Sequence, residues 1–301
     1  MADDGIPWIN PIGGLGDTLM VSGVLKQVVD RDPSKKFNLV RRTKYLSILK
    51  GHPAIGRIGY PPKKARIMDV TYWSLETLGP GLQRPYQILA RAFGLPTPVE
   101  EKLYVPWDLA EDPILHNMIP WKKPNIVIAP ASDSPRKVMS PVIWHRLVDF
   151  LRADGMFVMQ VGRIYDQHIR NAYCLLGLTT PRQLLSLLRK CDLVITSDNF
   201  IMHAAHPIDK PAVVLWGPTE HKMYGYPEHI HIQMPKSCKL SKDEDCIGSG
   251  KNKGETVYAK PCPMGPRHCL DQVRPEMIHE TVKKALWKKP HALPNTAVLP
   301  E

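Results

Sequence analysis

The sequence predicts an α/β protein built of two doubly wound lobes that face each other across a cleft. Short apolar runs alternate with segments of helical periodicity, which is typical of parallel strands joined by covering helices. This pattern begins twice in a chain whose 301 residues suit two cores. We therefore expect an amino-terminal lobe over 1–120, a carboxy-terminal lobe over 121–287 and a flexible tail over 288–301.

The first lobe opens with a predicted strand, turn and helix. Residues 6–12 are mostly apolar and precede the turn Gly13-Gly14-Leu15-Gly16, after which apolar residues recur at helical spacing until Pro33. A second strand is expected next. The remaining predictions for this lobe are strands over 37–40, 57–60 and 67–70 and helices over 82–93 and 109–118.

The second lobe repeats the alternation beyond 119–124, a segment with two prolines that we interpret as the linker. Its strands are apolar throughout, which indicates a parallel sheet covered by helices on both faces. The predicted strands are 125–129, 156–161, 193–196 and 213–216, and the predicted helices are 143–153, 181–190 and a last helix that ends at Leu286.

Composition places the chain among globular proteins, because 43% of its residues are hydrophobic and 23% are charged. No run of residues approaches the length of a membrane span, and the first residues lack the layout of a signal peptide. The sequence therefore predicts a cytoplasmic protein.

The net charge of +11 favours partners that carry phosphate, such as nucleotides, anionic membrane or nucleic acid. A solvated basic face explains the same charge. The basic residues cluster at Lys35, Lys36, Arg41, Arg42 and Lys44, and again at Lys236, Lys239, Lys242, Lys251 and Lys253.

The glycine turn is the first candidate site. Glycines allow the backbone to turn sharply into the helix, whose first N–H groups can receive an anion. The spacing lacks the third glycine of the dinucleotide fingerprint, which disfavours a nicotinamide cofactor. Asp17 follows the turn, and it is either a functional carboxylate or a helix-start residue favoured by the helix dipole.

The second lobe carries a longer motif. It runs from Cys191 through Asp198-Asn199-Phe200-Ile201-Met202-His203, and continues after Lys210-Pro211 to Gly217-Pro218-Thr219. These residues resemble the signature of glycosyltransferase family 9, the ADP-heptose:lipopolysaccharide heptosyltransferases. The turn at Gly13 to Leu19, the segment from Ala129 to Trp144 and the set Gly177, Thr179 and Leu184 also resemble parts of that family, in the same order and over most of the chain.

The resemblance implies a GT-B fold, with two Rossmann-like lobes, and an inverting glycosyltransferase. It implies that Asp17 is the general base toward the acceptor hydroxyl and that Lys137 contacts the donor phosphates. The donor would be an ADP-sugar, and no cofactor would be needed for catalysis because positive charge and helix N–H groups stabilise the leaving group. The other residues expected to bind the donor are Gly14, Gly16, Asp198, Asn199, His203, Gly217, Thr219, Arg163 and Asp166, with Arg136 in reserve for phosphate.

The chain departs from the family pattern at Asn199 and Phe200, which replace Ser-Gly. A side chain at the glycine position puts the detailed donor geometry in doubt. For His203 two readings stay open, a direct donor contact or a satisfied helix histidine.

Four of the six cysteines lie in one basic stretch, 236–270, which we call the cysteine segment. Four thiolates suit one structural zinc or iron ion, although the paired C-x2-C knuckles of a zinc ribbon are missing. Some family members carry a comparable metal finger, so a structural metal and free thiols both stay open. The four are Cys238, Cys246, Cys262 and Cys269, whereas Cys174 and Cys191 are expected to be buried packing residues.

The leading hypothesis is a heptosyltransferase that acts on a lipopolysaccharide core or related glycan, with peripheral contact to the anionic inner membrane. Transfer of heptose to a protein is the alternative acceptor chemistry. A non-catalytic nucleotide-sugar or nucleic-acid binding protein is the alternative from another class. Nucleic acid is disfavoured because Lys239 to Lys253 contains no interleaved aromatic residue.

Overall fold

The computed structural model describes residues 5–72, 84–107, 113–122, 124–235, 246, 260–262, 264–265 and 269–287. The chain divides into two compact units, Met1–Asp108 and Leu109–Glu301. The predicted tail and most of the cysteine segment, Cys238 included, lie outside the described residues.

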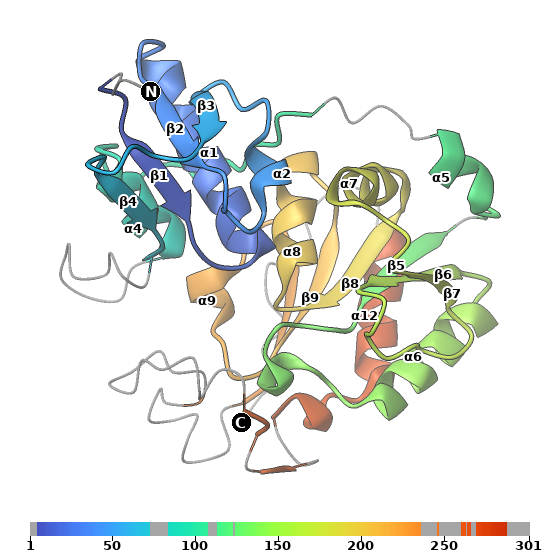
Figure 1. Cartoon of the computed structure of the whole chain (residues 1–301). Coiled ribbons are helices and arrows are strands. Elements are labelled where there is room, and N and C mark those ends of the chain that lie inside the picture. Colours follow the sequence, from blue (N-terminus) through green and yellow to red (C-terminus); the bar gives the residue numbers. More distant parts are fainter. Residues whose placement is uncertain are drawn as a thin grey trace. The chain divides into compact units, whose positions relative to one another are not determined.

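Unit 1 contains a parallel sheet of four strands in the order β3-β2-β1-β4. The order reverses at β1, which pairs with β2 on one side and with β4 on the other. In sheets of this kind the loops at such a reversal form the ligand site. The strands are β1 (Trp8–Pro11), β2 (Phe37–Val40), β3 (Ile55–Gly59) and β4 (Ile67–Val70), drawn in blue to blue-green in Figure 1.

Helix α1 (Leu15–Arg31) is the central helix of unit 1, and it contacts α2 (Leu46–Leu49) and α4 (Pro85–Ala92). Gly23 allows the chain near Lys102 to lie directly on this helix, because a Cβ at Gly23 would be 2.1 Å from the Lys102 carbonyl oxygen. The hydroxyl of the preceding residue, Ser22, donates a hydrogen bond to the Tyr104 carbonyl oxygen at 2.7 Å. Gly23 therefore allows another segment of the chain to pack closely against the helix, although a glycine inside a helix otherwise lowers stability.

His52 also ties α1 to the loop after α2. It is buried, and its Nε2 lies 2.9 Å from the Ser22 carbonyl oxygen while its Nδ1 accepts from the Ala54 N–H at 3.0 Å. Only the neutral ring with a proton on Nε2 satisfies both contacts. Burial lowers the pKa of His52 to about 4, which agrees with a neutral ring.

Unit 2 contains a parallel sheet of six strands in the order β10-β9-β8-β5-β6-β7. Renumbered from its own first strand, this is the order typical of dinucleotide-binding folds, with the reversal between β5 and β8. The strands are β5 (Asn125–Ala129), β6 (Phe157–Gly162), β7 (Tyr173–Leu176), β8 (Leu193–Ser197), β9 (Ala212–Trp216) and β10 (Ile230–Gln233).

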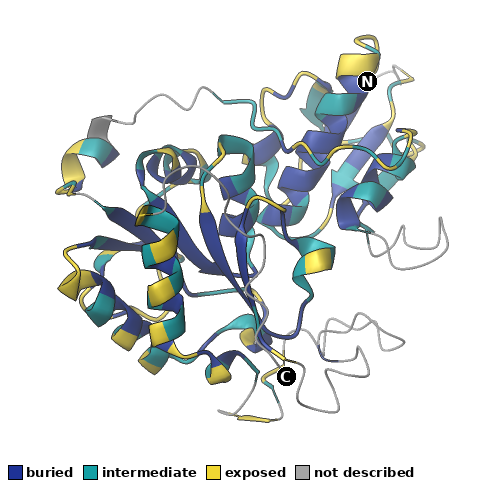
Figure 2. Ribbon diagram, turned by 180° about the vertical axis from the view of Figure 1, so that it is seen from behind, coloured by how far each residue is buried: buried dark blue, intermediate teal, exposed yellow. Residues whose placement is uncertain are grey.

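Helices cover both faces of this sheet. The core on one face joins Ile126 and Ile128 to Trp144 and Val148 of α6 (Pro141–Ala153) and to Ile278 of α12 (Pro275–Trp287). The alternate strand residues point to the other face, where α7 (Pro181–Lys190) and α8 (Phe200–Ala205) pack. Figure 2 shows the central strands buried throughout, as their sequences predict. The remaining short helices of this unit are α5 (Pro113–Met118), η2 (Pro135–Lys137), η3 (His206–Ile208), α9 (His221–Tyr224) and η5 (Cys269–Gln272).

The two units meet in sequence at residue 108, earlier than the predicted junction after 120. Helix α5 belongs to unit 2 because its carbonyl groups bond to unit 2 side chains. The Tyr173 hydroxyl donates to the Met118 carbonyl at 2.5 Å, and the Trp121 indole N–H donates to the His116 carbonyl at 3.0 Å. Lys190 also contacts the His116 ring.

The α/β class with two parallel sheets is confirmed, and strands β2, β4 and β5 have the predicted bounds. Strands β7 and β10 were not predicted. The expectation that Cys174 is buried is wrong, because Cys174 lies on the edge strand β7 with its side chain exposed, whereas Cys191 is buried as expected. Among the helices of the described ranges, none has the length and apolar character to cross a bilayer.

His52 makes the stability of unit 1 dependent on pH. Its pKa is lowered on folding from 6.5 to about 4, so its contribution is present above pH 6.5 and is lost as the pH falls toward 4. We expect His52→Leu to lower the free energy of unfolding at pH 7 by about 1–3 kcal/mol and to flatten its decline between pH 6.5 and 4. Urea unfolding at several pH values measures both effects. The exposed His168, changed to Ala, is the control; an equally steep decline in His52→Leu would contradict the assignment.

Candidate functional site

Asp17 lies in the first turn of α1, at the carboxyl edge of the unit 1 sheet, where the predicted glycine turn follows β1. Its Oδ2 accepts a hydrogen bond from the Gly14 N–H at 2.6 Å. Gly13 has φ of +127°, and a Cβ there would be 2.5 Å from the same Oδ2. The turn therefore holds the carboxylate in one position, and glycine at position 13 is needed for that position. Gly16 is buried in the first turn of the helix.

The hydrogen bond from the Gly14 N–H to Asp17 is the contact that the helix-start interpretation of Asp17 requires. This contact does not exclude a chemical role. An N–H donor near a carboxylate orients it and stabilises its charged form, which is the form that a general base needs.

A second polar group lies at the same edge and was not predicted. The Asn10 amide donates to Asp69 Oδ1 at 2.8 Å, and the Thr43 hydroxyl donates to Asn10 Oδ1 at 3.2 Å. These residues come from β1, β4 and the loop after β2, which are neighbours in the sheet but distant in sequence. Only the strand order brings them together, so the sequence alone offered no signal.

The structure divides the first basic cluster between two edges of this sheet. Arg41, Arg42 and Lys44 follow β2 at the carboxyl edge and are exposed, whereas Lys35 and Lys36 precede β2. Lys63 and Lys64 are exposed in the loop after β3 and add positive charge at the carboxyl edge. This edge, with Asp17, is therefore strongly basic.

In unit 2, the predicted donor residues gather at the reversal between β5 and β8. Lys137, from the turn η2 after β5, pairs with Asp198 at the end of β8, with Nζ 2.9 Å from Oδ2. The two side chains are 13% and 8% exposed. Such a pair is sheltered from solvent screening, so it fixes the position of the lysine more firmly than a surface pair would.

Burial by itself would raise the pKa of Asp198, but the charge and hydrogen bond of Lys137, together with Thr219, outweigh burial and lower it. Asp198 is therefore charged at neutral pH. His203 is different, because burial lowers its pKa to about 4 despite the nearby Asp198. Its Nδ1 lies 2.7 Å from the Tyr226 hydroxyl, so His203 is a neutral ring with a polar partner.

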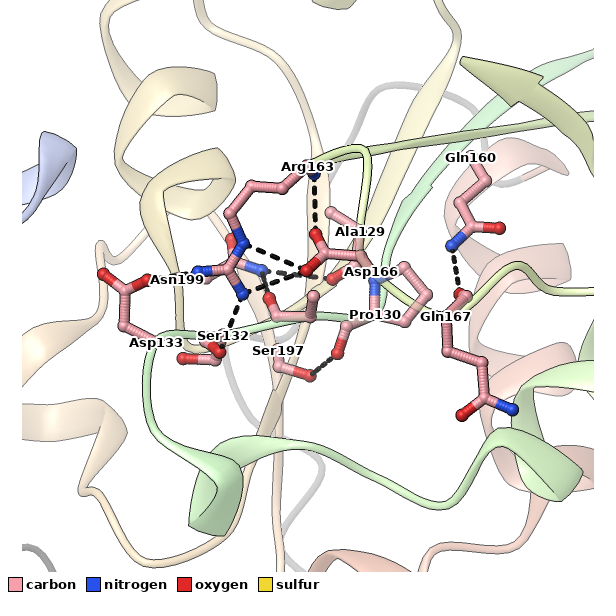
Figure 3. Close-up of polar contacts among 11 residues, drawn as sticks. Ala129, Pro130, Ser132, Asp133, Gln160, Arg163, Asp166, Gln167, Ser197 and Asn199 are labelled. Atoms are coloured by element: carbon pink, nitrogen blue, oxygen red, sulfur yellow. Dashed lines mark hydrogen bonds and ion pairs between the residues drawn. The ribbon is translucent and has the colours of Figure 1, made fainter. Parts of the chain in front are cut away.

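Asn199 has a structural role that explains the departure from the family pattern. Its Oδ1 accepts from the Ile201 N–H at 2.8 Å and so caps α8, and its Nδ2 donates to the carbonyls of Ala129 and Ala131 at 3.1 and 2.7 Å. Phe200 is the first residue of α8 and is not among the residues with positive φ, so the backbone conformation at this position does not require glycine. The substitution therefore links the loop after β5 to the start of α8 (Figure 3).

Arg163 and Asp166 are paired with each other at the end of β6. Asp166 Oδ2 accepts from the Arg163 N–H at 2.7 Å, and Oδ1 accepts from Arg163 Nε at 3.0 Å. The guanidinium also reaches Asp133 Oδ1 at 2.7 Å and the Ser132 carbonyl at 3.4 Å. Figure 3 shows this clamp, which joins the loops after β5 and β6.

Exposed apolar side chains flank this clamp. Ile164 and Tyr165 are 77% and 76% exposed, and the Arg163 guanidinium lies 5.0 Å from the Tyr165 ring centre. Gly177 lies against Ile164, since a Cβ at Gly177 would be 2.7 Å from the Ile164 Cβ. Large apolar residues beside a set of charged groups are suited to a flat aromatic ligand.

Thr219 is buried near Asp198, and Gly217 has a packing role. A Cβ at Gly217 would be 2.6 Å from Leu270 Cγ and 3.0 Å from Cys269 Sγ, so this glycine admits the end of the cysteine segment.

Arg136, the reserve candidate for phosphate contact, has two backbone carbonyl partners in the structure. It is 7% exposed, its Nε donates to the Lys260 carbonyl at 3.0 Å, and its Nη1 donates to the Cys246 carbonyl. Both carbonyls belong to the cysteine segment. Arg136 therefore anchors that segment to the turn that also carries Lys137.

Across the part of the chain that the structure describes, no three histidine, cysteine or acidic side chains lie together as a metal site would require. Cys246 is buried and Cys262 and Cys269 are half-buried, while Cys238 is outside the described residues.

Solved structures with the same fold come from bacterial glycosyltransferases. A glycosyl transferase family 9 protein from Veillonella parvula is 13% identical with a TM-score of 0.65, and covers 94% of this chain and 97% of its own. ADP-heptose lps heptosyltransferase II from E. coli is 17% identical with a TM-score of 0.63 and coverages of 93% and 98%. TibC from enterotoxigenic E. coli, described as a dodecameric iron-containing glycosyltransferase, is 14% identical with a TM-score of 0.69 and coverages of 93% and 76%.

These likenesses establish the GT-B fold that the sequence resemblance implied. No curated protein matches the chain. The model of glycosyltransferase family 9 (heptosyltransferase), however, matches residues 48–253, more than half of the chain. The chain therefore belongs to glycosyltransferase family 9.

Proposed function

We propose that this protein transfers a heptose, or a similar sugar, from an ADP-sugar to a lipopolysaccharide core or related glycan. The observation that carries the proposal is the buried Lys137–Asp198 pair at the strand-order reversal of unit 2, in a chain of this family. A reversal of strand order is where doubly wound sheets bind nucleotides.

The donor would bind along the carboxyl edge of the unit 2 sheet. A lysine ammonium can pair with a carboxylate and a phosphate oxygen together, so Asp198 would orient Lys137 toward the diphosphate. The exposed Ile164 and Tyr165 are suited to cover the adenine ring. One TibC structure is described as a complex with ADP-D-beta-D-heptose, which supports an ADP-heptose donor here.

Asp17 would act as the general base in a single displacement. The acceptor oxygen forms a bond to the anomeric carbon while the bond from that carbon to the diphosphate oxygen breaks. The hydroxyl proton passes to Asp17, and ADP leaves with the electron pair. One displacement inverts the anomeric configuration, and Lys137 would stabilise the charge on the leaving diphosphate.

The positive charge near Asp17 supports an anionic glycan as the acceptor. Arg41, Arg42, Lys63 and Lys64 are exposed at the edge that carries Asp17, and they suit an anionic glycan. We further propose a cytoplasmic protein in peripheral contact with the anionic inner membrane, and the net charge of +11 suits that contact. A protein acceptor is the alternative, and screening of both acceptor classes distinguishes them.

We also propose that the cysteine segment holds one structural zinc or iron ion. Four thiolates are a suitable donor set, and TibC is described as iron-containing. The ion would fold the segment and would supply no catalytic chemistry, because the transfer needs no metal in the scheme above.

Nucleotide binding tests the donor assignment. We expect calorimetry to give ADP an affinity about tenfold or more above UDP, GDP and CDP. Lys137→Met should weaken ADP binding roughly tenfold or more, because it removes a charge-assisted contact to phosphate. Lys284→Met, on the exposed side of α12, is the matched control. Absence of nucleotide binding by the wild-type protein would favour a non-catalytic family member.

Substitution of the proposed base separates chemistry from binding. Asn in place of Asp17 can still accept the hydrogen bond from Gly14, so the helix start should survive. We expect Asp17→Asn to lower transfer by about 10²- to 10⁴-fold and to leave the dissociation constant of ADP unchanged. Asp30→Asn, on the same helix, is the control. Turnover equal to that of the wild type would remove the assignment.

Metal content tests the cysteine segment. Elemental analysis of protein purified without chelators should give about one zinc or iron ion per chain. The double variant Cys246→Ser/Cys262→Ser should lose the ion, and Cys174→Ser should keep it. A metal-free wild-type protein would show that the thiols serve another purpose.

A further inference from the structure

Arg136 and Lys137 are neighbours in the turn η2 but have different partners. Lys137 pairs with Asp198 of the donor edge, and Arg136 donates to the Cys246 and Lys260 carbonyls of the cysteine segment. The turn contains only three residues, and its Lys137 N–H is bonded to the Ser134 carbonyl at 3.0 Å. If the carbonyl partners of Arg136 shift, the backbone of the turn, which also carries Lys137, is therefore expected to move.

Breaking the hydrogen bonds of Arg136 is expected to cost considerable free energy. A guanidinium that is 7% exposed needs hydrogen-bond acceptors within the protein, because burial of an unsatisfied charge is strongly unfavourable. Its acceptors here are carbonyl oxygens that lie 110 and 124 residues further along the chain. Displacement of the cysteine segment would leave this charge without those acceptors, so the turn is expected to follow the segment.

The end of the cysteine segment and the residue after it, Asp271, contact the donor edge independently. Asp271 Oδ1 accepts from the Ser140 N–H at 2.7 Å, which fixes the chain just after η2 and before α6. Leu270 and Cys269 lie against Gly217, two residues before Thr219. The cysteine segment therefore touches the donor loops at η2 and after β9, and Asp271, directly after it, contacts the start of α6.

We propose that Arg136 is a positioning residue through which the cysteine segment sets the place of Lys137, and with it the affinity for the donor diphosphate. This inference rests on the proposed function, because it assumes that Lys137 contacts the donor. Coupling of two sites is reciprocal in binding free energy, so ADP at the donor edge must also stabilise the cysteine segment in its anchored position.

The test uses the full chain with its native content of metal. Calorimetry gives the ADP dissociation constant of wild type, Arg136→Met and Arg136→Lys. We expect about a five- to tenfold rise for Arg136→Met and a smaller rise for Arg136→Lys, which keeps the charge. Arg152→Met is the matched control, because Arg152 also donates to a backbone carbonyl, that of Asn171 at 3.2 Å, on the outer side of α6.

The second readout is alkylation of Cys246 by iodoacetamide, followed by mass spectrometry with and without ADP. In wild type and in Arg152→Met, ADP should slow the reaction of this buried thiol. In Arg136→Met the reaction should be faster and should no longer respond to ADP at saturating concentration. A residue that only stabilises the fold would change the melting temperature and leave this response intact.

The outcomes are distinct. If Arg136→Met does not fold, Arg136→Lys supplies the comparison. Wild-type affinity for ADP and wild-type protection of Cys246 in a folded Arg136 variant would overturn the inference and leave the proposed function standing. Absence of ADP binding by the wild type would remove the proposed function and this inference together.

Discussion

Parallel strands that are buried on both faces confine the polar chemistry of each unit to the edges of its sheet. In unit 2 the strands β5, β8 and β9 are buried along their whole length, and their alternate residues pack on helices from both sides. Charged side chains have no place within such strands. They are found where the strands end, and the strand order decides which ends are neighbours. The reversal between β5 and β8 therefore explains why Lys137 and Asp198 meet.

The charges at the donor edge are largely balanced within the protein. Lys137 pairs with Asp198, Arg163 pairs with Asp133 and Asp166, and Arg136 is bonded to carbonyl groups. This balance keeps half-buried charges in fixed positions, which is the property that electrostatic stabilisation of a leaving group requires. These three cations of the described donor edge therefore have partners within the protein. In unit 1, Arg41 and Arg42 are exposed and place positive charge at the carboxyl edge of the other sheet.

The sequence was sufficient where burial leaves a regular pattern. Strand β5 reads as a continuous apolar run and has the predicted bounds. The turn at Gly13 could be predicted from its glycines, of which Gly13 has a φ that favours glycine. Strand β7 was missed because it is an edge strand, with Cys174 exposed and Tyr173 half-buried. Strand β10 was missed because His231 reads as polar. In the fold, its Nδ1 accepts from the Trp216 indole at 3.0 Å, and burial lowers the pKa of His231 to about 4.

Site residues could be predicted from the sequence where they belong to a single sequence motif. Asp198 and His203 belong to one sequence motif, with Asp198 directly after β8 and His203 in α8. Asn10, Thr43 and Asp69 are brought together only by strand pairing. Asn199 was a source of doubt because the family has Ser-Gly at 199–200. Its contacts with Ala129 and Ala131 show that the amide connects the loop after β5 to the start of α8, which its place in the motif does not reveal.

The different partners of Arg136 and Lys137 could not be predicted from the sequence. Two adjacent basic residues after a strand are equivalent as candidates for phosphate contact. The two residues have different partners because successive side chains of the short turn point in different directions. The planar guanidinium, with donors spread over several nitrogens, can bond two carbonyls of the cysteine segment at once, whereas the compact ammonium of Lys137 pairs with one carboxylate. A dipeptide thus joins a segment late in the chain to the donor edge, and its two residue types suit the two tasks.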